Sequence, residues 1–275
     1  MTPATKMLFV LLFVWGTIAN AQDPAGEEET DDAAVVSKQV LKPLTASRFV
    51  LPLNKDGGLW IDLKRKWVII DGSVCLREGP LEMFICPAQT KEHESVITTP
   101  IDAEAVHSSL LAIGAKTGSP VQFQPEYKCA TGSVIDIVVV WVGEDKQVNA
   151  SLAQNWIKKG NTRKTMQYAW VFGGSGYWKN PNTNEKIYYG NEGSLVCLSN
   201  FPTATMDLPV ESSNSNAARL YYANTSQIAP LKTSVRIIFA NRPDVDATKT
   251  PKVLSSGSTL LESVGNWAKE IGTTH

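Results

Sequence analysis

Short runs in which apolar and polar residues alternate recur along most of the chain, and this period of two predicts β-strands. Turn residues such as Asp56-Gly57-Gly58 and Glu78-Gly79-Pro80 separate successive runs. The predicted strands are 48–53, 59–63, 67–76, 81–86, 96–98, 121–124, 134–142, 147–152, 168–172, 186–189, 195–198, 220–222 and 234–240. So many strands beside one or two helices predict a β-rich α+β fold in a single domain.

Two features inside the predicted strands need comment. The run Val134–Val142 is nearly all β-branched, which predicts a core strand that is buried on both faces. Asp136 interrupts it, and we expect this carboxylate to face water where the strand begins, although it could serve a site. In the run 67–76, Asp71-Gly72 predicts a bend or a bulge.

One internal helix is clear from its boundary residues. Thr99 and Pro100 provide an N-cap and a first helical residue, apolar residues then recur at near-helical spacing, and Gly114 ends the pattern. His107 lies within this helix, and we expect it to be a partly exposed polar residue.

A second helix is predicted near the end of the chain. Thr259 and Glu262 form a capping box, and Leu260, Val264, Trp267 and Ile271 make one apolar stripe. This amphipathic helix should dock on the parent domain or on a partner.

Composition changes along the chain and predicts four regions. Residues 1–21 combine a basic start, a short apolar run and a small-residue end at Ala19-Asn20-Ala21, which is typical of a cleavable signal peptide. Residues 22–46 are acidic and predict a flexible leader. Residues 47–242 then form the β-rich domain, and residues 243–275 form a linker and the second helix. The mature protein is therefore expected in the periplasm or outside the cell.

Charge and hydropathy exclude some classes of partner. The formal net charge of −1 does not favour nucleic-acid binding, which normally needs a basic excess. Apart from the signal, no segment is long and apolar enough to predict an integral membrane span in the mature chain. An unknown protein or a small-molecule ligand remains as the expected partner.

The densest group of reactive side chains lies between residues 75 and 95. It contains Cys75, Cys86 and His93, and thiolate and imidazole ligands together suit a transition metal such as zinc, copper or iron. The polar residues around this group are Arg77, Glu78, Glu82, Glu92 and Glu94. The alternative is structural: four cysteines outside the cytoplasm predict disulfides or buried thiols, and their pairing stays open.

Other motifs carry weaker signals. Gly173-Gly174-Ser175-Gly176 lacks the pattern of a phosphate loop and predicts a flexible turn, while the flanking Trp170 and Trp178 could line a small-molecule pocket. Lys158 and Lys159 precede Gly160 and predict a solvated hairpin tip. No nucleophile motif is present, and no set of residues indicates a particular enzymatic reaction.

Several segments, in this order, resemble a bacterial group of exported YdjY-domain, ferredoxin-like proteins over roughly residues 48–240. The resemblance is carried by 59–62, 68–72, 75–95, 110–118, 170–176 and 197–204. One branch of that group has a cysteine cluster that implies an iron–sulfur centre, but Cys197 stands alone here, so an iron–sulfur cluster is not supported. Because Cys75, Cys86, His93 and Cys197 all lie in the matching segments, the resemblance implies one spatial cluster of these four.

Two functional hypotheses follow. The first is an exported binding or structural module without enzymatic activity. The second is a metal-binding or redox accessory protein that uses Cys75, Cys86, His93 and Cys197.

Overall fold

The computed structural model describes residues 41–160, 162, 164–212, 220–246 and 257–271. The predicted signal peptide lies outside these residues, as does most of the predicted leader. The end of that leader differs from the prediction: Leu41 is buried in the core, and the Lys42 carbonyl accepts a hydrogen bond from Arg236. Residues from 41 onward are therefore part of the folded domain.

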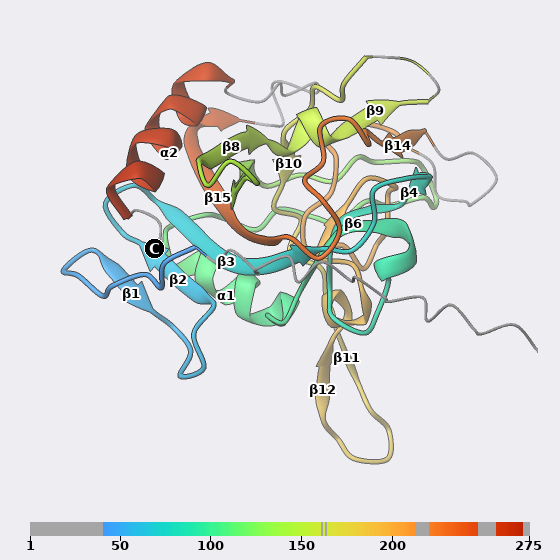
Figure 1. The fold of residues 1–275 in the computed structure, drawn as a ribbon. Coiled ribbons are helices and arrows are strands. Elements are labelled where there is room, and N and C mark those ends of the chain that lie inside the picture. Colours follow the sequence, from blue (N-terminus) through green and yellow to red (C-terminus); the bar gives the residue numbers. More distant parts are fainter. Residues whose placement is uncertain (1–40, 161, 163, 213–219, 247–256, 272–275) are drawn as a thin grey trace, which may run out of the picture. The chain divides into compact units, whose positions relative to one another are not determined.

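The described residues form a β-rich structure with two α-helices, as expected for an α+β fold (Figure 1). The helices are α1 (Ala103–Ala112) and α2 (Ser258–Ile271). The strands are β1 (Val50–Pro52), β2 (Leu59–Asp62), β3 (Trp67–Val74), β4 (Pro80–Leu81), β5 (Met83–Pro87), β6 (Ser95–Thr99), β7 (Ser133–Val142), β8 (Val148–Leu152), β9 (Ile157–Lys159), β10 (Trp170–Val171), β11 (Tyr177–Lys179), β12 (Lys186–Tyr188), β13 (Val196–Cys197), β14 (Tyr221–Ala223) and β15 (Ser234–Asp246). Short 3-10 helices are η1 (Glu92–Glu94), η2 (Ala153–Trp156) and η3 (Tyr189–Glu192).

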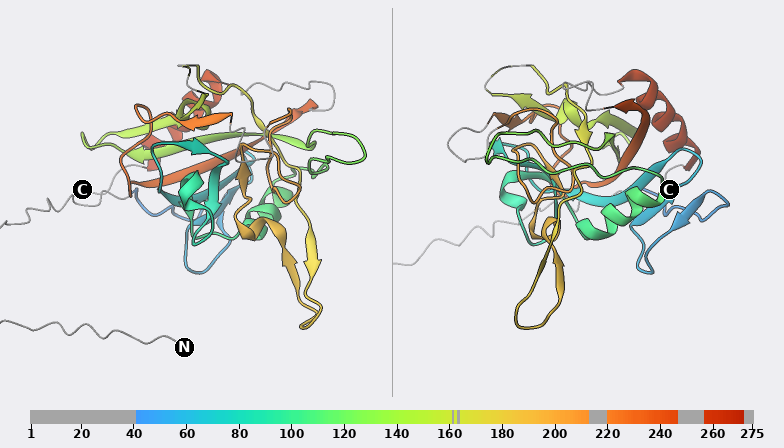
Figure 2. Two further views of the ribbon diagram at one scale, coloured as in Figure 1. Left: turned by 90° about the vertical axis from the view of Figure 1, so that its right-hand side faces the viewer. Right: turned by 180° about the vertical axis from the view of Figure 1, so that it is seen from behind.

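Within the described residues, ten strands form the main sheet, with the order β10-β7-β15-β3-β6-β5-β13. In addition, β2 joins β1 to β3, and β8 pairs with β7. Neighbouring strands of the main sheet are antiparallel, except that β5 and β6 run parallel. Two smaller sheets are the β11–β12 hairpin, which projects from the body in both views of Figure 2, and the set β4-β14-β9.

The central strands are buried on both faces, as the β-branched run of β7 predicts. Ile135, Ile137 and Val139 lie in one apolar core together with α1. Val138 and Val140 point to the opposite face, where they pack in a second core with α2. Figure 1 shows the two helices on opposite sides of these strands. The sheet is therefore a central layer between two apolar cores.

Asp136 differs from the prediction. It is fully buried, and Arg242 Nε lies 3.5 Å from Asp136 Oδ2. The strand β15 is longer than expected and runs to Asp246, which carries Arg242 alongside β7 and supplies the neutralising charge. A buried carboxylate with such a partner avoids the cost of an isolated charge.

The predicted bend at Asp71-Gly72 is not observed, because β3 pairs with β15 without a shift in register through both residues. On its other side β3 changes partner here, from β2 to β6. A Cβ atom at Gly72 would lie 2.7 Å from the Thr98 carbonyl oxygen. Glycine is therefore required at this position for the close approach of β6.

Other predicted boundaries moved by a few residues. The helix α1 begins after the N-cap Asp102 instead of Thr99, which is the last residue of β6. The Thr99 hydroxyl instead donates to the Asp71 carbonyl at 2.7 Å. The predicted strand 121–124 is reduced to one bridge between Gln122 and Lys128. Gly114 ends α1 with a φ of 88°, as expected.

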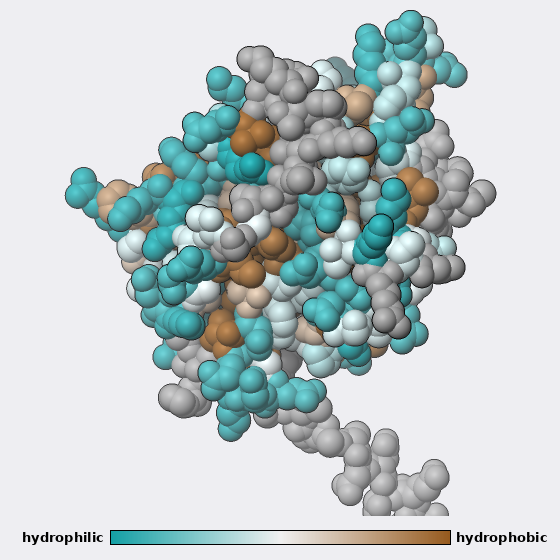
Figure 3. Space-filling model, turned by 90° about the horizontal axis from the view of Figure 1, so that it is seen from above, coloured by the Kyte–Doolittle hydropathy of each residue, from teal (hydrophilic) through white to brown (hydrophobic). Residues whose placement is uncertain are grey.

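The surface of the described residues is mixed. Figure 3 shows the face that carries α2 and β9 as mainly hydrophilic, with hydrophobic residues in small groups between polar ones. Within the described part of the chain, neither helix has the length and apolar character that a membrane span requires.

Candidate functional site

Cys75 and Cys86 lie on two strands that are not neighbours. Cys75 directly follows β3 and Cys86 lies in β5, while β6 separates the two strands. The direct cross-strand pairing that a hairpin would give is therefore absent, and all four cysteines are free thiols in the structure. The Cys75 thiol donates to the Ser95 carbonyl at 3.0 Å, and the Ser95 hydroxyl interacts with the Cys86 thiol.

The electrostatics of this pair disfavour thiolates. Burial is the main cause that raises the pKa of Cys75 to about 12, and Cys86 and Glu92 contribute to this rise because they carry like charge when ionised. Burial also raises the pKa of the Cys86 thiol, against hydrogen bonds from Ser95, the Lys91 backbone and Thr90. Of the predicted cluster, the structure therefore brings together Cys75, Cys86 and Glu92. The two cysteines are protonated thiols, and Glu92 is the carboxylate beside them.

The other two predicted ligands have different surroundings. His93 is exposed on η1. Cys197 is fully buried in a small apolar cluster with Met83 and Ala204, and burial and Asp207 raise the pKa of its thiol. In the described part of the chain, no group of three or more His, Cys, Asp or Glu side chains is arranged to hold a metal ion. The four-residue metal site stays a prediction.

The charged residues around the cluster serve separate contacts. Glu78 is exposed, whereas Glu82 and Glu94 are buried, and Lys91 Nζ lies 3.6 Å from Glu94 Oε1. Glu92 accepts a hydrogen bond from the Gln89 backbone N–H. Arg77 points elsewhere: its guanidinium donates to the carbonyls of Thr225 and Ile228, both at 3.1 Å.

The two tryptophans predicted to line a ligand pocket have different surroundings. Trp170 is fully buried, stacks on Phe84 and donates its indole N–H to the Cys197 carbonyl at 2.8 Å. It is therefore a core residue, since the short β10 places it opposite Ile135 in the main sheet. Trp178 lies on the projecting hairpin, opposite Ile187.

The glycine-rich turn 173–176 covers a hydrogen-bonded group that the sequence did not reveal. The Tyr188 hydroxyl donates to the Gly174 carbonyl at 3.1 Å, and His107 Nδ1 and Thr205 Oγ1 each lie 3.0 Å from its oxygen. His107 also packs its ring against Phe172 and Tyr188. Burial lowers the pKa of His107, which keeps its imidazole neutral near pH 7.

Next to this group, Asp207 is a fully buried carboxyl. It accepts hydrogen bonds from the Asn200 side chain at 3.0 Å and from the backbone N–H groups of Leu208 and Phe201 at 2.7 and 3.3 Å. Burial outweighs these donors and raises the pKa of Asp207 to about 7. The residue holds the loop 199–208 together, and the structure gives it no opening toward a ligand.

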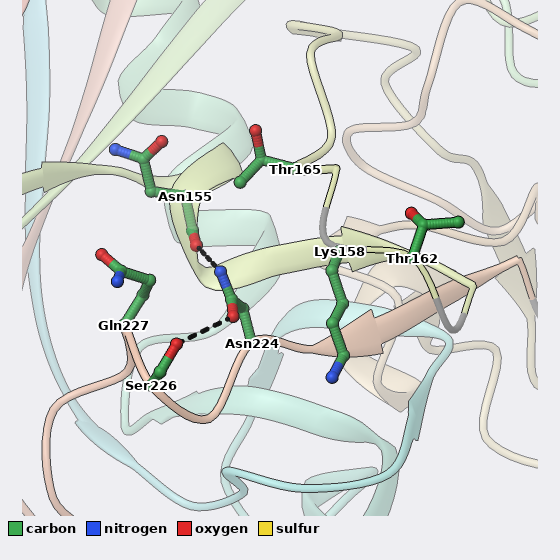
Figure 4. Close-up of a pocket in the computed structure, with 7 residues that line it drawn as sticks. All are labelled: Asn155, Lys158, Thr162, Thr165, Asn224, Ser226 and Gln227. Carbon is green, nitrogen blue, oxygen red and sulfur yellow. Dashed lines mark hydrogen bonds between the residues drawn. The ribbon is translucent and has the colours of Figure 1, made fainter.

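A polar pocket lies where β9 meets the turn that follows β14. Its volume is about 480 Å³, and it is lined by amide, hydroxyl and ammonium groups (Figure 4). The lining residues are Asn155, Lys158, Thr162, Thr165, Asn224, Ser226 and Gln227. Lys158 is the single charged side chain among them, so the pocket is weakly positive and contains no carboxylate.

Hydrogen bonds fix part of this lining and leave part of it available. The Asn224 amide donates to the Asn155 carbonyl at 2.8 Å, and Ser226 Oγ donates to Asn224 Oδ1 at 3.3 Å (Figure 4). Within the described residues, the side chains of Lys158, Thr165 and Gln227 make no hydrogen bond. These three groups are therefore available to a ligand.

Arg77 supports the pocket from outside. Its two hydrogen bonds hold the carbonyls of Thr225 and Ile228, and the Thr225 hydroxyl donates back to the Arg77 carbonyl at 2.7 Å. The turn that carries Asn224, Ser226 and Gln227 is thereby fixed to the segment after β3. Arg77 is thus a positioning residue for this turn.

The pocket could not be predicted from the sequence, because its two halves lie about 60 residues apart along the chain. The predicted hairpin at Lys158 and Lys159 is present, since Lys158 pairs with Thr165 across the turn. On its other side Lys158 pairs with Tyr222 of β14, and its side chain lines the pocket. The one sequence feature that could have indicated the pocket is that Asn, Thr, Ser and Gln are frequent in both segments. This composition is also typical of ordinary turns.

Comparison with known proteins gives a family and no closer relative. The YdjY domain matches residues 59–240, which is most of the chain and covers the strands β2 to β14 and most of β15. No curated protein and no solved structure matches the chain. Since the match extends over more than half of the sequence, the chain belongs to the YdjY domain family.

Proposed function

We propose that this protein is an exported binding module that takes up a small, hydroxyl-rich molecule with one negative charge. The observation that carries the proposal is the polar pocket between β9 and the turn 224–227, with its volume of about 480 Å³. Pockets that hold small ligands have volumes of roughly 300–1,000 Å³. No iron–sulfur centre is part of the proposal.

The chemistry of the lining selects the ligand class. Amide and hydroxyl side chains both donate and accept hydrogen bonds, so they match a ligand that carries many hydroxyl groups. An apolar ligand would leave these groups without partners and would bind poorly. Lys158 adds a single positive charge, which favours one carboxylate or comparable anionic group on the ligand.

Export is supported by the sequence of residues 1–21. The apolar run and the small residues Ala19 and Ala21 are typical of a cleaved signal, so the mature chain is expected to begin at Gln22 in the periplasm or outside the cell. Expression of the full gene product in an exporting host, followed by N-terminal sequencing, tests this. A protein that retains Met1 in the cytoplasmic fraction would refute export.

Binding can be tested by calorimetric titration with glucuronate and, as the uncharged counterpart, glucose. Wild-type protein should bind glucuronate more tightly than glucose. Lys158→Gln should weaken glucuronate binding by about tenfold or more, since a hydrogen bond to a charged group contributes about 1.5–3 kcal/mol.

Lys159→Gln is the matched control. Lys159 is the next residue of β9, is exposed and does not line the pocket. Its replacement should leave both affinities unchanged. Equal effects of the two substitutions, or no heat with either sugar, would contradict the proposed ligand class.

A further inference from the structure

The strand β1 and the residues beside it carry a row of exposed apolar side chains. Phe49, Leu51 and Leu53 are 43%, 37% and 44% exposed. They alternate along the strand, so their side chains lie on the same face of the sheet. β1 lies at an outer edge of the body in Figure 1 and in the right-hand view of Figure 2, where it is blue. These three residues therefore form one apolar patch, the β1 patch.

The register of β1 and β2 places the β1 patch beside buried core residues. Leu51 lies opposite Ile61, and the Leu53 N–H donates to the Leu59 carbonyl at 3.0 Å. Residues that lie opposite each other share one face of a sheet. Ile61 and Leu59 are buried in the core that also contains residues of α1. The apolar layer on this face therefore continues past its covered part and is open to solvent at β1.

The backbone edge of β1 is closed to a further strand. Because the backbone groups of the patch residues bond to β2, those of Val50 and Pro52 point outward. The Ser47 N–H donates to the Val50 carbonyl at 2.9 Å, and the Val50 N–H donates to Ser47 Oγ at 3.1 Å. Pro52 has no N–H to offer. A partner must therefore contact the side chains of the patch and not its edge.

Cations surround the β1 patch. The Arg48 guanidinium lies 5.5 Å from the centre of the Phe49 ring. The Leu63 N–H donates to the Phe49 carbonyl at 2.9 Å, which places the turn between β2 and β3 at the same end of β1. Within residues 47–66 there is one exposed acid, Asp56, and the exposed cations are Arg48, Lys55, Lys64 and Lys66. The patch is therefore apolar at its centre and positively charged at its margin.

We propose that the β1 patch docks this protein on the surface of an anionic lipid bilayer. The apolar side chains enter the boundary between headgroups and acyl chains, and the cations stay level with the lipid phosphates. A second copy of the chain fits less well, because the closed edge prevents strand pairing. Three side chains that are each less than half exposed also provide far less than the roughly 800 Å² per partner that a specific protein interface buries.

The proposal is tested by sedimentation of the mature chain with vesicles of phosphatidylglycerol and phosphatidylcholine in equal amounts, and with vesicles of phosphatidylcholine alone. The wild type should bind the mixed vesicles more tightly, and added salt should weaken this binding. Leu51→Thr should weaken it by about fivefold or more, because apolar area that enters the bilayer is lost. Threonine favours strands, so β1 should be kept.

Leu231→Thr is the matched control, since Leu231 is 56% exposed in the turn before β15 and lies outside the β1 patch. It should bind both kinds of vesicle like the wild type. Arg48→Gln changes an exposed charge without touching the core. It should weaken binding to the mixed vesicles by about fivefold and leave binding to phosphatidylcholine unchanged.

Absence of binding to the mixed vesicles, or equal effects of Leu51→Thr and Leu231→Thr, would overturn the proposal. A concentration-dependent dimer in analytical ultracentrifugation that Leu51→Thr abolishes would also overturn it, because the patch would then join two copies of the chain. The β1 patch and the polar pocket share no residue. Lys158→Gln should therefore dock like the wild type, so failure here and failure of the sugar proposal are distinguishable.

Discussion

At the scale of single residues, buried polar groups explain why the loops around the sheet are ordered. The Tyr188 hydroxyl joins α1, the glycine-rich turn and the segment after β13 through His107, Gly174 and Thr205. Such a group is costly when left without partners in the interior. A single side chain therefore ties three segments that are distant in sequence.

Replacement of Tyr188 by Phe should lower the free energy of unfolding by about 1–3 kcal/mol, because the partners of its hydroxyl lose their bonds. Urea denaturation measures the change. Tyr189→Phe is the control, since its hydroxyl makes no hydrogen bond within the described residues, and it should be nearly neutral. An equal loss in both variants would refute the assigned role.

Asp207 predicts a pH dependence of stability. Burial raises its pKa to about 7 in the folded state, from 3.8 when unfolded. The folded state thus binds more protons, so stability from this group is present at low pH and is lost as the pH rises through 7. The free energy of unfolding should fall by about 2–3 kcal/mol between pH 5 and 8.

The comparison with Asp207→Asn isolates this contribution, because the amide does not titrate. Denaturant unfolding at several pH values should show a wild-type loss with rising pH that the variant lacks. Parallel profiles of the two proteins would mean that Asp207 stays ionised throughout, held by its three N–H donors.

At the scale of elements, sequence patterns were reliable where the whole pattern has one physical cause. The β-branched run of β7 and the glycine at the end of α1 could be predicted because burial and backbone geometry leave few alternatives. The point at which a strand changes its pairing partner could not be predicted. Gly72 predicts a bulge in the sequence, but in the structure it allows the close approach of β6, which only the tertiary structure determines.

The helix α2 is held on the sheet by its apolar side chains. Val264, Trp267 and Ala268 are buried in the second core, and the rings of Trp67 and Trp267 meet edge to face at 5.9 Å. The sequence predicted the apolar stripe, and the structure identifies the parent sheet as the surface that it covers.

Trp267→Ala should lower the free energy of unfolding by about 3–5 kcal/mol or release α2 from the sheet, because the largest buried side chain of the helix is lost. The measurement is hydrogen exchange of the α2 backbone amides. Either result lowers their protection below that of the wild-type protein. Asn266→Ala, at an exposed neighbouring position, should change stability by no more than about 0.5 kcal/mol. Unchanged protection in Trp267→Ala would contradict the docking described here.

At the scale of the whole molecule, the polar pocket lies outside the main sheet, between β9 and the turn that follows β14. The Cys75–Cys86 pair was foreseeable in part, since both thiols lie in one dense segment, while the separation of Cys197 depends on the sheet order. The polar pocket depends on β9 pairing with β14, a long-range contact with no local signal. The pocket is thus formed only in the assembled fold.

The most direct test of the binding proposal is to locate a bound ligand by NMR. During titration with glucuronate, the side-chain amide signals of Asn155, Asn224 and Gln227 should shift together and saturate. The amide signals of Asn182 and Asn184, on the tip of the projecting hairpin, should stay fixed. Saturable shifts elsewhere with none in the pocket would contradict the account.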